Sequence, residues 1–477
     1  MAQQARHRSH ACAIIGERRR LDYRQFLDEV DDAAAYLESL QLKAGEPIII
    51  GVAPCPEFHV VFFAACALGL LVLPALPSGK IPALMVQAGP RAAVGSASFL
   101  REARARCGGV THFLEYGPDE TFRFSRRAAN WSRARACRDE PILAVSSSGT
   151  TGEPSLYPRS ARQILNRAEM RAAAHQLRAD DVLFSTRPYN SGSAINNHVI
   201  MPVFVGCSIV VQERFERIKA ADAISRERVT VLWAVPFIFE MLASVPQERT
   251  LDFSSVRMCV SGSAALSPAV AQRFEERFGL IIRQRYGGSQ IHPAFTFNLD
   301  GPRDSVGRID GMFPIVILDD DGNELVAPRI GEIAFDVAKS PPLWRKTLEA
   351  NPNVRNGYLR SGDLGRADEL GNVYVVGRKS AFIKVGANRV EPAEVENVLR
   401  LHPKVSEALV YAVKIGDVEE AVHADVIARD GANERDLLNF CAQHLDGYKC
   451  PRRIFIKDDL PRNVHGKIIR PAPALIK

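Results

Sequence analysis

The stretch PILAVSSSGTTG, residues 141–152, places an apolar segment directly before a loop of small residues. Residues 142–145 (ILAV) predict a buried β-strand. Residues 146–152 (SSSGTTG) combine hydroxyl side chains with glycines, so backbone N–H groups and hydroxyls can surround phosphate oxygens without steric conflict. The loop is not a Walker motif, because no Gly-Lys-Ser/Thr sequence ends it. Alone, the run is better explained as a flexible turn, and the phosphate-binding hypothesis therefore depends on the rest of the chain.

Further short motifs follow this loop in a fixed order. They are residues 286–290 (YGGSQ), 358–363 (YLRSGD), 377–386 (GRKSAFIKVG) and 461–467 (PRNVHGK). Together with the first loop they resemble the adenylate-forming superfamily, which includes acyl- and aryl-CoA ligases, stand-alone adenylation domains and firefly luciferase. The resemblance extends over residues 12–470. It implies the class of enzyme but not the substrate.

The resemblance also implies where ATP and Mg²⁺ bind. Tyr286 flanks the adenine and Ser289 contacts the α-phosphate, while Thr151 and an acid at position 290 bind Mg²⁺. Here that acid is replaced by Gln290, whose amide oxygen can bind the ion but contributes no charge. Relatives also carry a lysine near the pyrophosphate where this chain has Ser155, with Arg159 as a candidate replacement. The residues assigned to the nucleotide are Ser147, Ser148, Gly149, Thr150, Thr151, Gly152, Ser263, Ala264, Tyr286, Gly287, Ser289, Gln290, Asp363 and Arg378.

Asp363 matches the family acid that accepts hydrogen bonds from the ribose hydroxyls. It lies in residues 360–365 (RSGDLG). A carboxylate suits this role because it can accept from two vicinal hydroxyls at once. A turn aspartate before Gly365 is the structural alternative, but the length of the matching pattern favours the ribose role. By the same resemblance, Arg378 approaches the ribose and phosphate.

Two lysines have predicted catalytic roles. Attack of a carboxylate on the α-phosphate of ATP accumulates negative charge, and the ammonium of Lys467 is predicted to stabilise it. The resemblance assigns Lys384 to the second, thioester-forming step and places Gly386 where the pantetheine arm passes. Relatives pivot at an Asp or Lys two positions after the arginine of the hinge, whereas this chain has Ser380 there. Ordinary surface lysines are the structural alternative for both lysines.

Residues 188–192 (PYNSG) match the segment that contacts the acid in relatives. Many CoA ligases have a histidine at the position of Asn190, and amino-acid-activating relatives supply an aspartate in this region. No aspartate lies between residues 187 and 203, and a buried ammonium without a counter-ion is costly, so an α-amino acid is disfavoured. Asn190, Asn196 and Asn197 favour a substituted aryl acid, although the last two are equally explained as helix caps and aliphatic acids stay open. The predicted substrate-binding residues are Tyr189, Asn190, Ser191, Gly262 and Gly288.

The order of apolar segments predicts an α/β fold with two domains. Strands such as residues 229–235 alternate with helices such as residues 23–40 and 268–278, which implies parallel sheets covered on both faces. Near residues 331–335 the pattern becomes strand-rich and predicts a β-barrel-like portion. We predict a large N-terminal AMP-binding and acyl-pocket domain over residues 1–378. A small mobile α+β domain that carries the catalytic lysine is predicted over residues 379–477, with helices at 392–401 and 434–444 and strands at 408–413, 421–428 and 453–456.

The composition excludes several other classes of protein. The chain has 477 residues and a net charge of +6, and its Arg-rich stretches match no nucleic-acid-binding motif, so no nucleic-acid partner is expected. Nine cysteines without a CxxC pair argue against a zinc site and for a reducing cytoplasm. Residues 58–76 are apolar, but Gly69 and Pro74 interrupt them, which predicts a helix and a buried strand rather than a membrane span. Residues 1–10 show no signal peptide.

These motifs predict the reaction of ATP with a small carboxylic acid to give acyl-AMP and pyrophosphate. The acyl group is then transferred to the thiol of CoA or of a carrier-protein phosphopantetheine. One alternative is an adenylation enzyme that serves only an acyl or peptidyl carrier protein, including one for an aliphatic or fatty acid. Another is a non-catalytic relative, which the uncharged residues at positions 155, 290 and 380 would fit. The chain has the family residues at Lys467, Asp363 and Arg378, which favours an active enzyme over a non-catalytic relative.

Substitution of Lys467 by alanine tests the predicted division of labour between the two half-reactions. Loss of one charge-stabilising group should slow acyl-AMP formation by roughly two to three orders of magnitude. Thioester formation from a chemically supplied acyl-AMP should be nearly unchanged, since the lysine acts only in the first step. Single-turnover measurements of both steps check this, and an equal loss in both would contradict the assignment.

Overall fold

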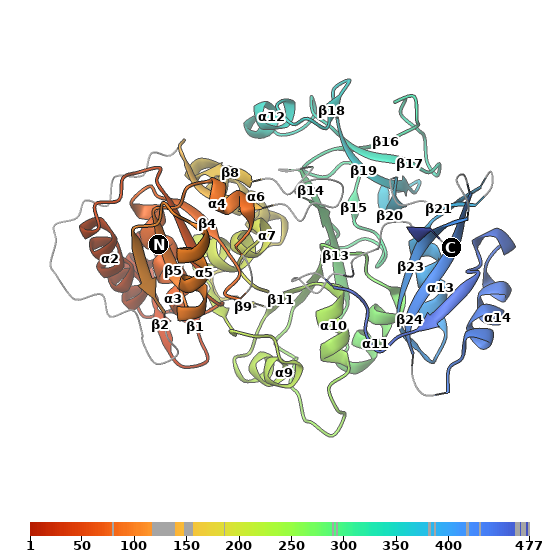
Figure 1. The fold of residues 1–477 in the computed structure, drawn as a ribbon, viewed down its shortest axis with the longest axis horizontal. Helices are drawn as coiled ribbons and strands as arrows, with labels where there is room; N and C mark the ends of the chain where they lie inside the picture. The colour runs from red at the N-terminus through yellow and green to blue at the C-terminus, as the bar shows by residue number, and fades with distance from the viewer. Residues whose placement is uncertain are drawn as a thin grey trace. The chain divides into compact units, whose positions relative to one another are not determined.

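The computed structural model describes residues 1–78, 81–116, 139–146, 156–185, 187–288, 291, 294–379, 383–385, 388–415, 419–428, 431–462, 468 and 474–475. The chain divides into two compact units. Unit 1 comprises residues 1–234 and 245–258, and unit 2 comprises residues 235–244 and 259–477. The ribbon of both is drawn in Figure 1. The predicted boundary between residues 378 and 379 stays a prediction.

One sheet of unit 1 carries the strand that precedes the phosphate loop. Its order is β6-β5-β3-β4-β7-β8, and all neighbours are parallel except the antiparallel pair β7 and β8. Ile48, Ile49 and Ile50 are fully buried, as expected for a parallel strand covered on both faces. The strand predicted at residues 142–145 is confirmed by β7. The bounds are β3 (Pro47–Gly51), β4 (Leu71–Pro74), β5 (Ala92–Gly95), β6 (His112–Glu115), β7 (Pro141–Ser146) and β8 (Leu156–Ser160).

A second set of strands in unit 1 runs in the order β11-β9-β10-β1-β2. Neighbours are parallel except for β1 and β2, which pair antiparallel. This topology confirms the predicted α/β class for unit 1. The bounds are β1 (Cys12–Ile15), β2 (Arg20–Asp22), β9 (Val182–Phe184), β10 (Ser208–Val210) and β11 (Val231–Ala234).

The helices of unit 1 follow the predicted apolar pattern. In α2, Asp22 caps the helix and exchanges hydrogen bonds with Gln25 in a capping box. The apolar stretch 58–76 is a helix, a turn at Gly69 with φ of +72°, and the buried strand β4. No described helix combines the length and apolar character needed to cross a bilayer. The helices are α1 (Ala2–His7), α2 (Tyr23–Ser39), α3 (Pro56–Ala67), α4 (Ala83–Gln87), α5 (Ala97–Arg106), α6 (Ala161–Ala174), α7 (Gly192–Ala194), the π-helix η1 (Ile195–Ile200), α8 (Met201–Val205) and α9 (Arg217–Arg226).

Unit 2 begins with strands and helices that continue the alternating pattern. β12 and β13 are parallel, and β13 and β14 are antiparallel. The predicted helix 268–278 is confirmed by α11, with Pro268 in its first turn and Gly279 at its C-cap with φ of +70°. The bounds are α10 (Pro236–Ala243), β12 (Met258–Ser261), α11 (Pro268–Phe278), β13 (Ile282–Gly287) and β14 (Phe295–Phe297).

The strand-rich region of unit 2 is an open antiparallel sheet. Its order is β15-β20-β19-β17-β16, and the short β18 pairs with β19. The sequence predicted a barrel-like portion here, but no pairing joins β15 to β16 in the part of the chain that the structure describes. The bounds are β15 (Gly307–Arg308), β16 (Ile315–Leu318), β17 (Gly331–Asp336), α12 (Pro342–Glu349), β18 (Val354–Arg355), β19 (Tyr358–Ala367) and β20 (Asn372–Arg378).

The C-terminal part of unit 2 has the predicted α+β composition. Helices 392–401 and 434–444 and strand 453–456 are confirmed at their predicted bounds. The sheet runs β25-β24-β23-β26, and its core includes Val395, Leu399 and Leu437. The bounds are β21 (Ile383–Val385), β22 (Asn388–Val390), α13 (Pro392–Leu401), β23 (Val405–Ile415), β24 (Glu419–Ala428), α14 (Glu434–His444), the 3-10 helix η2 (Gly447–Lys449), β25 (Arg453–Ile456) and β26 (Ala474–Leu475).

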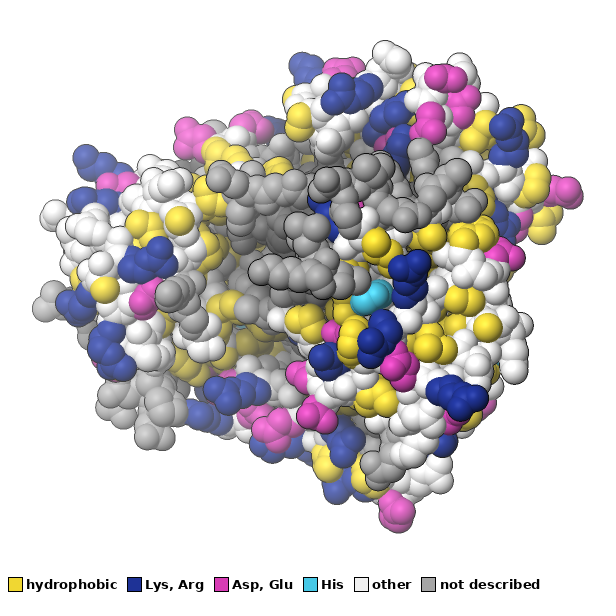
Figure 2. All heavy atoms as spheres, turned by 45° about the vertical axis from the view of Figure 1, so that its right-hand side comes forward, with side chains coloured by type: hydrophobic (Ala, Val, Ile, Leu, Met, Phe, Trp, Pro, Cys, Tyr) yellow, Lys and Arg dark blue, Asp and Glu magenta, His cyan; other side chains and the backbone are white. Residues whose placement is uncertain are grey.

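The charged side chains of the surface are mixed in sign. Figure 2 shows Lys and Arg interspersed with Asp and Glu over the described residues of the face that it draws. Mixed charge of this kind favours solubility over recognition of a polyanion. This face therefore gives no support to a nucleic-acid partner.

Asp181, the residue before β9, forms a buried ion pair with Arg257 in unit 1. Its side chain is 1% exposed, and Arg257 donates to it from Nη2 at 2.5 Å and from Nε at 2.8 Å. Thr230 Oγ1 adds a hydrogen bond at 2.7 Å. Burial alone would raise the pKa of Asp181, but hydrogen bonds from Arg257, the backbone N–H of Arg178 and Thr230 outweigh it and lower the pKa below its usual value.

Replacing Arg257 by methionine should leave this carboxylate buried without its cation. We expect the free energy of unfolding to fall by about 3–5 kcal/mol at neutral pH, measured by urea denaturation. Because the pKa of Asp181 is lower in the folded state, the stabilisation is complete above the unfolded value of about 3.9 and is lost as pH falls through the folded value. The difference between wild type and variant should therefore shrink in acid.

Arg249→Met is the matched control. Arg249 pairs with Asp222 at 2.8 Å, but the two side chains are 44% and 37% exposed. Exposed pairs contribute about 0–1 kcal/mol, so this variant should be nearly as stable as wild type. Equal losses in the two variants would contradict the role given to the buried pair.

Candidate active site

Asp363 lies in a bulge of β19 in unit 2. Along β17 and β19, Glu332 faces Leu364 and Ala334 faces Arg360, so residues 361–363 lie opposite the single residue Ile333. Gly362 adopts φ of +74°, a left-handed conformation that favours glycine. Bulges change the direction of a side chain and recur next to active sites. The bulge therefore interrupts the regular alternation of side chains at Asp363, and a second register shift follows between Leu364 and Gly365 on the side of β20.

The carboxylate of Asp363 has two partners in unit 2. Tyr286, on β13, donates its hydroxyl to Oδ2 at 2.6 Å. Arg378, at the end of β20, places Nε 3.2 Å from Oδ1 and lies opposite Asp363 in the strand pairing. The sequence assigned all three residues to the nucleotide, and the structure brings them together.

Burial raises the pKa of Tyr286 well above its usual value, and the carboxylate of Asp363 raises it further. The phenol is therefore protonated and acts as a donor at physiological pH. Its ring lies nearly parallel to that of Phe335, with centroids 6.4 Å apart and an interplanar angle of 9°. The tyrosine thus has a defined ring orientation and a fixed hydrogen bond.

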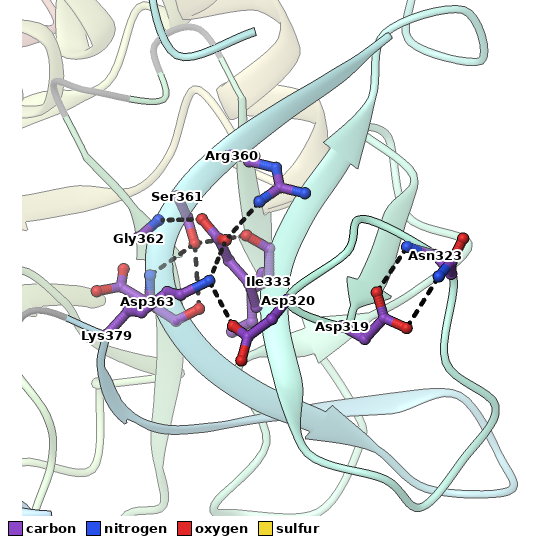
Figure 3. Close-up of polar contacts among 10 residues, drawn as sticks. Asp319, Asp320, Asn323, Ile333, Arg360, Ser361, Gly362, Asp363 and Lys379 are labelled. Carbon is purple, nitrogen blue, oxygen red and sulfur yellow. Dashed lines mark hydrogen bonds and ion pairs between the residues drawn. The ribbon is translucent and has the colours of Figure 1, made fainter. Parts of the chain in front are cut away.

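A second carboxylate, Glu332 on β17, lies beneath the bulge. It accepts from the backbone N–H of Gly362 at 3.2 Å, from Arg360 Nη1 at 3.2 Å and from Lys379 Nζ at 3.4 Å. Figure 3 draws this network, in which Lys379 also reaches Asp320 at 2.9 Å. Glu332 lies outside the motifs that the sequence singled out. The available signal was an acid within the apolar strand 331–335 (GEIAF).

In the loop after β12, the backbone at Gly262 lies so close to a neighbouring strand that a side chain there would be crowded. A Cβ atom on Gly262 would lie 3.2 Å from the carbonyl oxygen of Arg285, and Ser263 has φ of +72°. Gly287 has φ of +153°, and a Cβ atom there would lie 3.0 Å from Cβ of Phe295. Non-glycine residues in left-handed conformations concentrate at functional sites. Ser263, Ala264 and Gly288 are exposed at this end of the strands.

Three of the predicted acid-binding residues, Tyr189, Asn190 and Ser191, lie in unit 1 near α7, whereas Gly262 and Gly288 belong to unit 2. Tyr189 is 2% exposed, and its ring packs edge-on against Phe58 at 4.9 Å and His59 at 5.3 Å. Asn190 is half-buried, and its Oδ1 has no hydrogen-bond partner among the described residues. Ser191 caps the following helix by accepting from the backbone N–H of Ala194 at 3.3 Å. Ser191 therefore has a structural role in addition to the predicted one.

The π-helix η1 carries three buried polar residues. Asn197 Oδ1 accepts from Arg171 Nη1 at 2.7 Å, and Arg171 is 1% exposed. The alternative that Asn196 and Asn197 are helix caps is wrong, because both lie inside η1 and are buried. π-Helical turns are frequent at functional sites. The 3.6-residue periodicity used on the sequence does not reveal them.

His198, also on η1, is a neutral imidazole. It is 1% exposed, and neither ring nitrogen has a hydrogen-bond partner in the described ranges. Burial lowers the pKa of His198 to about 3, with contributions from Arg187 and His59. Asn196 Nδ2, 5% exposed by residue, likewise finds no partner within those ranges. Buried polar groups are normally paired, so these atoms mark a place for polar ligand atoms or water.

Several predicted residues fall outside the described ranges. These are the phosphate-loop residues from Ser147 to Gly152, together with Ser289, Gln290, Gly386 and Lys467. Lys384 lies on β21, whose backbone alone is described at that position. Among described residues, no group of three or more His, Cys, Asp or Glu side chains is arranged to hold a metal ion.

Comparison with known proteins decides the family. Residues 1–338 match the model for the AMP-binding enzyme family, and residues 394–467 match the model for its C-terminal domain. The chain belongs to the AMP-binding enzyme family. The resemblance to the adenylate-forming superfamily is thereby confirmed, and the protein is an AMP-forming acid–thiol ligase.

Individual relatives of this AMP-binding enzyme act on different acids. An indoleacetate–CoA ligase of Aromatoleum aromaticum is 30% identical over 335 residues, which cover 69% of this chain and 66% of that protein. A long-chain-fatty-acid–CoA ligase of Mycobacterium tuberculosis is 26% identical over 473 residues, 94% of this chain and 92% of that protein. The ATP-bound structure of MatB from Rhodopseudomonas palustris aligns with a TM-score of 0.84 at 25% identity, covering 98% and 96% of the two chains.

The fold is shared more widely. The anthranilate CoA ligase AuaEII, solved with anthranoyl-AMP, aligns with a TM-score of 0.86 at 23% identity and covers 98% of this chain and 94% of that chain. This likeness concerns the fold alone. The predicted fold class is confirmed by these structural neighbours.

The hydrogen bond from Tyr286 to Asp363 should contribute measurably to the stability of unit 2. Tyr286→Phe keeps the ring beside Phe335 but leaves Oδ2 without its donor. We expect a loss of about 1.5–3 kcal/mol in unfolding free energy, the range for hydrogen bonds to charged groups. Tyr358→Phe is the control, because it removes a hydrogen bond of 2.7 Å to the exposed Glu324. Chemical denaturation that finds equal effects for the two variants would contradict a special role for Tyr286.

Proposed function

We propose that this enzyme converts ATP and a substituted aryl acid into acyl-AMP and pyrophosphate and then transfers the acyl group to the thiol of CoA. The observation that carries the nucleotide part of the proposal is the convergence of Tyr286 and Arg378 on Asp363. The family provides the reaction class, and the polar residues of unit 1 support the choice of acid.

Asp363 is the proposed acceptor for the ribose hydroxyls. A carboxylate offers about four acceptor positions and can accept from two vicinal hydroxyls at once. Tyr286 contacts one of its oxygens and Arg378 contacts the other. Arg378 neutralises the carboxylate and Tyr286 fixes its rotation, so the acceptor is oriented before ATP arrives.

Lys467 is the proposed electrostatic catalyst of the first step. The carboxylate oxygen of the acid attacks the α-phosphorus, an acyl–phosphate bond forms, and the bond to pyrophosphate breaks. Negative charge is concentrated near the phosphorus in the transition state, where an ammonium lowers the barrier. Lys384 is proposed to act in the second step, in which the CoA sulfur attacks the acyl carbon and AMP leaves.

Mg²⁺ is proposed to accompany the ATP phosphates. The two residues assigned to it, Thr151 and Gln290, lie outside the described ranges. No group of three or more His, Cys, Asp or Glu side chains among the described residues is arranged to bind the ion.

The residues around Tyr189 support an aryl acid with a polar substituent. Tyr189 packs edge-on against Phe58 and His59 in a buried aromatic cluster, and Asn190, Asn196 and His198 offer unpaired polar atoms within the described part of unit 1. None of these groups carries charge, because the low pKa of His198 keeps it neutral. Asp181, which precedes this segment, is already paired with Arg257. The group therefore suits a neutral hydroxyl, amino or carbonyl substituent and not an ammonium.

The acid and the acceptor can be tested together. Pyrophosphate exchange over a panel of hydroxybenzoates, aminobenzoates, benzoate, indoleacetate and straight-chain acids should be fastest with a polar-substituted aryl acid. Thioester should then form with CoA and be followed by mass spectrometry. Preferred exchange with a fatty acid would overturn the aryl assignment, and thioester formation only on a carrier-protein phosphopantetheine would overturn CoA as the acceptor.

Asn190→Ala sharpens the same test. Loss of one hydrogen bond to the ring substituent should reduce kcat/KM for the preferred substituted acid by about tenfold. Unsubstituted benzoate is the internal control and should be affected far less by the variant. An equal reduction of kcat/KM for both acids would show that Asn190 does not form a hydrogen bond with the ring substituent.

A further inference from the structure

The bulge in β19 leaves backbone groups that the strand ladder does not pair. The N–H of Asp363 is satisfied by Ser361 Oγ at 3.0 Å, and the Ser361 hydroxyl in turn lies 2.6 Å from the carbonyl oxygen of Ile333. The N–H of Gly362 is satisfied by Glu332 Oε1 at 3.2 Å. The conformation that directs Asp363 thus depends on two side chains, one of them a buried carboxylate.

Glu332 also receives two cations through its other oxygen. Arg360 Nη1 lies 3.2 Å and Lys379 Nζ lies 3.4 Å from Oε2, while the Glu332 side chain is 6% exposed. A charge at this depth is costly unless it is paired and hydrogen-bonded. The carboxylate therefore requires all three contacts, and its position is closely determined by them.

Gly362 is held by hydrogen bonds on both of its backbone groups. The backbone N–H of Lys379 donates to the carbonyl oxygen of Gly362 at 2.9 Å, so both backbone groups of the glycine are held. The side chain of Lys379 returns to Glu332, and the preceding residue, Arg378, pairs with Asp363. Displacement of Glu332 would therefore disturb Gly362, Lys379 and Arg378 together.

We propose that Glu332 is a positioning residue for nucleotide recognition. It fixes the backbone of Gly362 so that the neighbouring Asp363 presents its carboxylate to the ribose hydroxyls, and this role rests on the proposed ribose function of Asp363. Glu332 touches no substrate itself. The proposal differs from a purely structural role because it requires the effect of Glu332 to pass through Asp363.

Glu332→Gln tests the proposal with little change of volume. The amide oxygen can still accept from Gly362, but the NH₂ group and the loss of charge break the contacts with Arg360 and Lys379. The readout is kcat/KM for ATP compared with 2′-deoxy-ATP and 3′-deoxy-ATP in pyrophosphate exchange. Asp363→Asn should remove most of the discrimination between these nucleotides. Glu332→Gln should reduce kcat/KM for ATP by about tenfold and should reduce the discrimination with it.

The double variant separates positioning from stability. In an Asp363→Asn background, Glu332→Gln should have little further effect on ATP use, because both changes act through one carboxylate. Asp320→Asn is the matched control: it removes a contact of 2.9 Å with Lys379 from a residue that is 74% exposed and should leave the discrimination unchanged. If Glu332→Gln does not fold, Glu332→Asp, which keeps the charge but shortens the reach to Gly362, is measured in its place with the same expected loss.

The outcomes separate this inference from the proposed function. Unchanged discrimination in a folded Glu332 variant, with discrimination lost in Asp363→Asn, overturns the positioning role and leaves the ribose assignment intact. Additive losses in the double variant also overturn it, because they show that Glu332 acts independently of Asp363. Unchanged discrimination in Asp363→Asn overturns the ribose assignment itself and the role of Glu332 with it.

Discussion

A bulge within an antiparallel sheet must find partners for the backbone groups that the ladder no longer pairs. In β19 this constraint falls on Gly362, and the buried carboxylate of Glu332 satisfies it. That carboxylate in turn requires cations, which Arg360 and Lys379 supply. The ion pair of Asp363 with Arg378 then follows from the same register, since the two residues lie opposite each other on β19 and β20. The bulge at Gly362 is thus linked to a charged network that includes Glu332, Arg360 and Lys379.

The sequence predicted the regular elements well because their ends carry local signals. Helix α11 has proline in its first turn and a left-handed glycine at its end, and α13 likewise begins with Pro392. Three residues predicted to bind the nucleotide, Tyr286, Asp363 and Arg378, lie in recognisable motifs. The structure adds that two of them are partners of the third, at 2.6 Å and 3.2 Å.

The features that the sequence did not predict depend on long-range register or on small departures from ideal geometry. Glu332 meets its partners over separations of 28, 30 and 47 residues, which no local pattern encodes. The π-helix η1 has i→i+5 hydrogen bonds, which a 3.6-residue periodicity does not predict, and the sequence therefore left Asn196 and Asn197 open to interpretation as helix caps. The portion that was predicted to be barrel-like is an open sheet. A strand-rich sequence pattern predicts that strands pair, but it does not predict whether the first and last strands of the sheet also pair and close a barrel.

The polar groups described around Asp363 and around η1 differ in character. Asp363 and Glu332 are each paired with a guanidinium or an ammonium, a preorganised arrangement suited to a charged nucleotide. Around η1, burial keeps His198 neutral and Asn190 and Asn196 supply further neutral polar atoms, while the guanidinium of Arg171 is used by Asn197. A neutral polar group discriminates by hydrogen bonding, because a ligand that lacks the matching group leaves buried atoms unpaired. The ion pairs of Asp363 and Glu332 would thus serve the common nucleotide, whereas the neutral groups of Asn190, Asn196 and His198 would serve the choice of acid.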